Sequence, residues 1–152
     1  MTLRERLGAD IKDAMRARDA LRLLTLRGLS AAIQRAEIDQ RQGGEATLDE
    51  ATVLAVVQKQ AKQRRESAAQ YDAAGRAELA DVERAELVLI ESYLPTQASD
   101  DDIRAEIARI VAETGASGAA AMGRVMGPAM AALKGRADGT RVQAFVREAL
   151  GA

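Results

Sequence analysis

The chain has 152 residues and a formal net charge of −1 at pH 7, and it contains no cysteine and no histidine. Without these two residue types it has no Ser-His-Asp or Cys-His catalytic set, no disulfide framework and no ordinary zinc or haem ligands. The near-neutral charge argues against a strongly basic nucleic-acid-binding protein and against DNA as a partner, so any nucleic-acid surface must be a local patch.

The composition predicts an all-α protein. Apolar residues make up 47% of the chain and aromatic residues only 2%. The core is therefore built from aliphatic side chains and from alanine, which is the best helix former.

Four helices are predicted in residues 1–94, as long helical hairpins. The first begins with a capping box of Thr2 and Glu5. The second covers about residues 19–39 and is apolar on much of its circumference, so we expect it to be the most buried helix. A second capping box, Thr47 with Glu50, predicts the start of a third helix that runs to about residue 74.

The fourth helix covers about residues 76–94. Gly75 is predicted to end the third helix, and Pro95 to end the fourth. The apolar residues expected to be buried on the fourth helix include Leu79, Val82 and Ile90. These four helices define a predicted N-terminal domain of residues 1–94.

Residues 95–152 are predicted to form a small C-terminal domain of three to four helices. Residues 95–98 are interpreted as a linker, and Ser99 with the following aspartates opens the fifth helix, which Gly115 ends. Two short helices are expected at about 119–126 and 128–133, with Pro128 at a first helical position. The last helix covers about residues 140–150.

No metal or other cofactor is expected. The acidic run Asp100–Asp102 fans out around a helix, so we interpret it as a helix start and not as a metal site. No apolar segment is long enough to span a membrane, and the charged start does not resemble a secretory signal. A cytoplasmic location without membrane partners is therefore expected.

A first basic patch lies on the third helix. Lys59, Lys62 and Arg65 stand three residues apart, so they form one row that could follow RNA phosphates. The alternative is a solvated face, partly neutralised by Glu66 four residues after Lys62.

A second patch is rich in glycine and contains Met122-Gly123-Arg124-Val125-Met126-Gly127 and Lys134-Gly135-Arg136-Ala137-Asp138-Gly139. Glycines permit close approach of a backbone or a phosphate, and the basic residues supply donors. The alternative is a core stripe of Met122, Met126 and Met130, with the glycines as caps and turns. No aromatic residues lie in either patch, so sequence-specific reading of RNA bases is not expected.

These motifs, in this order, make the chain resemble a known family. The resemblance rests on the two glycine-rich segments above and on the segments Lys62-Gln63-Arg64-Arg65-Glu66-Ser67, Ala74-Gly75-Arg76 and Tyr93-Leu94-Pro95. In these segments the chain resembles the YqeY family and the tail of the B subunit of aspartyl/glutamyl-tRNA amidotransferase, a carbon–nitrogen ligase that takes its amide nitrogen from glutamine.

The resemblance implies a role beside that enzyme and not catalysis, because the tail helps to hold tRNA while chemistry occurs elsewhere. It makes five residues candidate contacts to the tRNA backbone: Gly123, Arg124, Gly127, Lys134 and Arg136. An accessory tRNA-binding module, with an amidotransferase or another tRNA enzyme as partner, is the leading hypothesis. The alternatives are a protein–protein adaptor without an RNA role and a free-standing amidotransferase-like enzyme.

Overall fold

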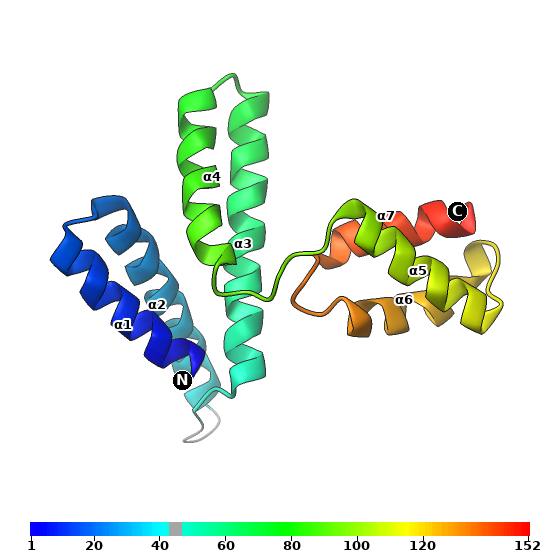
Figure 1. The fold of residues 1–152 in the computed structure, drawn as a ribbon, viewed down its shortest axis with the longest axis horizontal. Helices are drawn as coiled ribbons and strands as arrows, with labels where there is room; N and C mark the ends of the chain where they lie inside the picture. The colour runs from blue at the N-terminus through cyan, green and yellow to red at the C-terminus, as the bar shows by residue number, and fades with distance from the viewer. Residues whose placement is uncertain (43–46) are drawn as a thin grey trace. The chain divides into compact units, whose positions relative to one another are not determined.

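The computed structural model describes residues 1–42 and 47–152, and every regular element in these ranges is helical, which confirms the all-α class (Figure 1). The elements are α1 (Leu3–Ala17), α2 (Ala20–Arg41), α3 (Glu50–Ala73), α4 (Ala77–Glu91), α5 (Asp100–Thr114), the 3₁₀ helix η1 (Ala119–Ala121), α6 (Met122–Ala132) and α7 (Gly139–Leu150). Among the described residues no helix is both long and apolar enough to cross a bilayer.

The chain forms two compact units, Met1–Leu94 and Pro95–Ala152, and each has its own hydrophobic core. The N-terminal unit consists of two helical hairpins, α1–α2 and α3–α4 (Figure 1). Its core combines buried residues of all four helices, among them Leu7, Leu26, Val57 and Ile90.

Side-chain caps mark the beginnings of α1, α2 and α3. The Thr2 hydroxyl accepts the N–H of Glu5 and the Glu5 carboxylate accepts the N–H of Thr2, which confirms the first capping box. The second predicted box is wrong. Asp49 caps α3 by accepting the N–H of Thr52 at 2.7 Å, so Glu50 is the first helical residue and its carboxylate accepts the N–H of Leu3 instead.

Helix α2 is not enclosed in the way its composition predicted. It packs against α1, α3 and α4 with one face, which buries Leu26, Leu29 and Ile33. Leu21 and Leu24 nevertheless lie exposed on another face. The prediction failed because the four-helix unit covers only one side of α2, although the helix is apolar on two.

Helix α4 also differs from its prediction. It ends at Glu91, before the residue preceding Pro95, and it buries Ala80 and Ile90 while Val82 is exposed. Gly75 adopts a left-handed conformation with φ of 72° after α3, which confirms its role as a helix stop.

The C-terminal unit packs α5, α6 and α7 around a second core. The Ser99–Asp102 capping box and the left-handed Gly115 confirm the predicted limits of α5. The core residues come from all three helices, and Ile103, Ile107, Val125 and Val146 are almost fully buried.

Helix α6 is one continuous helix, where two short ones were expected. Pro128 lies inside it, so the carbonyl of Arg124 cannot accept the usual N–H from four residues later. Val125, Ala129 and Leu133 are buried at spacings of four residues, and packing of this stripe offsets the cost of the proline.

The predicted methionine stripe is only half correct, because the core stripe of α6 is made of other residues. Met122 and Met126 pack against the edge of the core, whereas Met130 is exposed and lies against Gly139. A Cβ on Gly139 would stand 3.0 Å from the Met130 Cε atom, so a side chain there would displace the end of this exposed methionine.

Residues 95–98 are held to the C-terminal unit and are not a free linker. Ala98 is buried in that unit's core, and its N–H donates to the Arg136 carbonyl at 2.8 Å. The Gln97 amide donates to the Gly135 carbonyl at 2.9 Å. The second unit therefore begins at Pro95.

Candidate phosphate-binding surface

The basic row on α3 is largely neutralised by carboxylates. The Lys62 Nζ atom lies 4.0 Å from Glu66, and the Arg65 Nη2 atom lies 2.8 Å from Glu91 of α4. Lys59 is exposed and has no ion pair within residues 1–42 and 47–152. For Lys62 and Arg65 the geometry favours the solvated-face alternative. Glu66 can be recognised from its spacing to Lys62, but the pairing with Glu91 depends on how α3 and α4 align in the hairpin and was not predicted.

A neighbouring arginine joins the two helices of the same hairpin. The Arg64 Nε atom lies 2.9 Å from the Glu86 carboxylate, and its Nη1 atom lies 3.7 Å from that of Glu83. All three side chains are partly buried. A partly buried arginine between two carboxylates fixes the alignment of the helices, so this part of the motif is structural.

A different arrangement exists on the outward side of α6. Gly123, Gly127 and Ala131 follow one another at spacings of four residues, and all three are exposed. A Cβ added to Gly123 or Gly127 would meet nothing within 4 Å. Packing inside this unit therefore does not require glycine at either position, and the helix backbone is accessible there.

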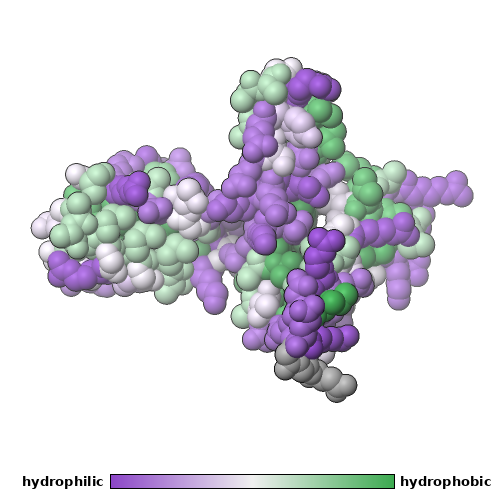
Figure 2. Space-filling view, turned by 180° about the vertical axis from the view of Figure 1, so that it is seen from behind, coloured by the Kyte–Doolittle hydropathy of each residue, from purple (hydrophilic) through white to green (hydrophobic). Residues whose placement is uncertain are grey.

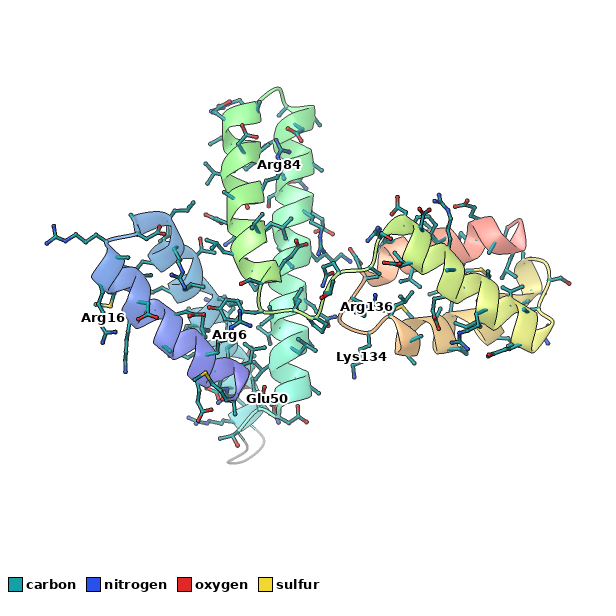
Figure 3. The ribbon with its side chains drawn as sticks, viewed as in Figure 1. Arg6, Arg16, Glu50, Arg84, Lys134 and Arg136 are labelled. Atoms are coloured by element: carbon teal, nitrogen blue, oxygen red, sulfur yellow. The ribbon has the colours of Figure 1, made fainter. Side chains whose placement is uncertain are left out.

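Two cations stand beside this strip. Arg124 and Lys134 are exposed, and neither has an ion pair in the part of the chain that the structure describes. Lys134 follows the last turn of α6, and its side chain points away from the helices (Figure 3). We call Gly123, Arg124, Gly127, Ala131 and Lys134 the α6 surface.

The other arginines of this unit show that this lack of partners is selective. Arg104 lies 3.4 Å from Glu148, Arg109 lies 2.8 Å from Glu113, and Arg141 pairs with Asp100. Ion pairing of this kind leaves less charge for a ligand. Arg136 and Arg147 also have no ion pair among the described residues. Arg136 donates to a backbone carbonyl, and Arg147 lies in the last turn of α7, where a cation complements the helix dipole.

Arg136 serves the fold instead of the α6 surface. Its Nε atom donates to the Thr96 carbonyl at 3.2 Å, and its own carbonyl accepts the N–H of Ala98 (Figure 3). The sequence placed Arg136 with Arg124 and Lys134 because all three lie near glycines. In the structure, the Arg136 side chain lies against residues 95–98, the segment before α5.

The acidic run at the start of α5 is used for capping and pairing. The Asp102 carboxylate accepts the N–H of Ser99 at 3.1 Å, and Asp100 pairs with Arg141. Hydrogen bonds from the Ser99 backbone and hydroxyl lower the pKa of Asp102 below its usual value, and the charge of Arg136 adds to this effect. The helix-start interpretation of this run is confirmed.

One partly buried polar cluster around Tyr93 was not found from the sequence. The Tyr93 hydroxyl donates to the Asp10 carboxylate, the Arg6 guanidinium lies 4.5 Å from the centre of the Tyr93 ring, and Arg22 lies 3.5 Å from Asp10. Burial and the bond to Asp10 raise the pKa of Tyr93, so the phenol stays protonated at neutral pH. The cluster joins α1 and α2 to the turn after α4.

Comparison with known proteins shows the family of the chain. Residues 4–150 match the family of Yqey-like proteins. A relative in Pyrenophora tritici-repentis is 30% identical over 97% of this chain and 80% of its own length. Relatives in Kluyveromyces lactis and Vanderwaltozyma polyspora are 34% and 36% identical over 70% and 58% of this chain. The chain spans about half the length of these last two relatives, at 57% and 46%.

All three relatives are named "Altered inheritance of mitochondria protein 41, mitochondrial". These names contradict the cytoplasmic location expected from the sequence, and that prediction is wrong. It relied on the absence of cysteine and of a secretory signal, and neither feature distinguishes one reducing compartment from another. With the match over residues 4–150, the chain belongs to the Yqey-like protein family.

Proposed function

We propose that the chain is an accessory RNA-binding module whose α6 surface contacts the phosphate backbone of tRNA, and that chemistry is carried out by a partner enzyme. The observation that carries the proposal is the exposed pair Arg124 and Lys134, which have no carboxylate partner among the described residues of a unit whose other exposed arginines are mostly paired. Such cations bind phosphates by releasing the counterions of the RNA.

The glycines support the same function. Gly123 and Gly127 present no side chain on two successive turns of the outward side of α6, so a sugar–phosphate strand can approach the helix closely there. Arg124 lies in the first turn of α6 and Lys134 follows its last turn, so the two cations stand near opposite ends of the helix. The two cations would therefore hold different phosphates of one strand, and this spacing favours a polymer over a single small anion.

Family resemblance supports tRNA as the polymer. The motifs Met122–Gly127 and Lys134–Gly139 resemble the tail of the B subunit of aspartyl/glutamyl-tRNA amidotransferase. We infer that a tRNA enzyme of this glutamine-dependent class is the partner that supplies the chemistry. Catalysis by the chain alone has no support from the described side chains, because the ionisable clusters found there serve as caps and inter-helix pairs.

The experiment is a titration of total tRNA with the full chain, followed by fluorescence anisotropy between about 50 mM and about 200 mM salt. Wild type is compared with Arg124→Ala/Lys134→Ala. The matched control is Arg104→Ala/Arg109→Ala, which removes the same charge from two exposed, ion-paired arginines of the same unit.

We expect the α6 double variant to bind more weakly and to reduce the slope of log K against log salt by about 1.8, or about 0.9 for each lost phosphate contact. The control variant should keep a slope close to that of wild type. Absence of binding at the lowest salt, or an equal loss in both variants, would show that the α6 surface does not bind RNA.

A further inference from the structure

The solvent side of α2 carries large apolar residues. Leu21 is 40% exposed, Leu24 is 67% exposed and Ile38 is 60% exposed. The opposite side of the same helix supplies Leu26 and Leu29 to the core of the N-terminal unit. A helix that is apolar on two sides is normally covered on both. Figure 2 shows apolar surface on the α1–α2 hairpin, bordered by hydrophilic side chains.

These residues belong to one row along the helix. Positions 21, 24, 28, 31, 35 and 38 recur every three or four residues, and such positions share a face. The row consists of Leu21, Leu24, Gly28, Ala31, Arg35 and Ile38, which we call the α2 outer face. Residues 21–38 extend for about 26 Å along the axis, enough for a second helix of several turns.

The centre of the α2 outer face is unusually flat. Gly28 and Ala31 are both exposed, and a Cβ added to Gly28 would meet nothing within 4 Å. Glycine in a helix interior is less favourable than alanine, and packing within this unit gives no reason for it. The large residues lie at both ends of the row and the small ones between them, so another helix can approach the centre closely.

The charges along this face are mainly basic. Arg35 lies within the row and has no ion pair in the described ranges, and Arg27 lies beside it. Within α2, Asp39 is the acidic residue next to the row, at its C-terminal end. A second copy of the chain would bring Arg35 against a basic face of the same kind, which is unfavourable. Insertion into a bilayer would need large apolar side chains where Gly28 and Ala31 stand.

We propose that the α2 outer face binds an acidic amphipathic helix of a partner protein. The apolar stripe of that helix would lie across Gly28 and Ala31 and contact Leu24 and Ile38. Its flanking carboxylates would face Arg27 and Arg35. This is helix-in-groove recognition, in which an apolar stripe gives affinity and flanking charges select the partner. The proposal does not depend on the α6 surface, which lies on the other unit.

The experiment uses a display library of helical peptides. Every peptide carries the same leucine and alanine stripe, while the flanking positions combine glutamate, lysine and glutamine at random. Selection is carried out on the full chain, and the readout is the ratio of glutamate-flanked to lysine-flanked peptides recovered. We expect the wild type to favour glutamate flanks by at least about tenfold, which corresponds to about 1.4 kcal/mol.

Three variants make the result specific. Leu24→Glu should abolish the selection, and Arg27→Glu/Arg35→Glu should invert it toward lysine flanks. Val88→Glu on α4 is the matched control, because Val88 is equally exposed and lies outside the face. Circular dichroism should show the same helix content in all variants, since each substitution is at a surface position.

The proposal would be overturned if glutamate-flanked and lysine-flanked peptides were recovered equally, or if Leu24→Glu recovered the same peptides as wild type. It would also be overturned if no peptide were recovered above background. It would also be overturned if the wild type formed a dimer that Leu24→Glu dissociates, because the occupant would then be a second copy of the chain. The last measurement is co-sedimentation of the chain with anionic phospholipid vesicles. If wild type sediments with the vesicles and Leu24→Glu does not, the α2 outer face binds a membrane and the proposal is wrong.

Discussion

Helices α2 and α6 both carry an outward face that their own unit does not explain, but the two faces differ in chemistry. The α2 outer face has large exposed leucine and isoleucine side chains around a flat centre. The α6 surface has glycines and alanine, with Arg124 and Lys134 beside them. Apolar side chains gain from removal of water, whereas bare backbone with cations suits a polyanion. This difference is why we propose a protein helix as the ligand of α2 and an RNA backbone as the ligand of α6.

The largest expected effect separates the two sides of α2. Leu26→Ala, at a position 1% exposed, should lower the free energy of unfolding by about 2–5 kcal/mol, because it leaves a cavity in the core. Leu24→Ala should change it by no more than about 0.5 kcal/mol. Urea denaturation followed by circular dichroism measures both values. Similar losses for the two variants would show that Leu24 is covered in solution.

The next effect tests whether Arg136 belongs to the fold or to the RNA surface. Arg136→Ala removes the exposed hydrogen bond to the Thr96 carbonyl and should cost about 0.5–1.5 kcal/mol of stability in the C-terminal unit. The slope of log K against log salt for tRNA binding should be the same in Arg136→Ala as in wild type. A slope reduced by about 0.9, with unchanged stability, would show that Arg136 contacts RNA as the sequence predicted.

Glycine substitutions on α6 should separate stability from binding. Gly127→Ala should raise the free energy of unfolding by about 0.4–1 kcal/mol, since the added Cβ meets nothing and the unfolded chain loses freedom. The same variant should bind tRNA more weakly if the backbone of the RNA lies against the helix. Gly28→Ala on α2 is the control, because it should give a similar gain in stability without changing tRNA affinity.

The smallest expected effect is on the pH dependence of the C-terminal unit. The pKa of Asp102 is lower in the folded chain than its usual value of 3.8, so its carboxylate stabilises the fold above that pH. This stabilisation is lost as the pH falls through the folded pKa. Asp102→Asn should therefore be less stable than wild type at pH 7, and the two unfolding curves should converge in acid. A constant difference at every pH would exclude ionisation as the cause.

Local signals predicted the helices well where a single residue decides the structure. The Thr2 and Ser99 caps and the left-handed Gly75 and Gly115 depend on neighbours three or four residues away, so they can be read from the chain. Pro128 was assigned by the same local rule, and there it failed. The buried stripe of α6 outweighs the preference of proline for a first turn, and sequence spacing does not show that balance.

The candidate surfaces depended on contacts between helices, and these were harder to predict. Arg65 and Arg124 look alike in sequence, yet Glu91 of the neighbouring helix neutralises Arg65 while Arg124 keeps its charge free of described partners. Leu24 and Leu26 are two residues apart and equally apolar, but only Leu26 faces the core. Which of two similar residues remains available to a ligand is decided by tertiary packing.

The division at Pro95 has a consequence for how the two faces work together. Because the α2 outer face and the α6 surface lie on separately folded units of one chain, a ligand held by one unit stays tethered near the other. A short tether sets an effective local concentration on the order of millimolar. A partner helix and a tRNA that each bind weakly would thus be kept together by the chain, with an avidity that neither contact supplies alone.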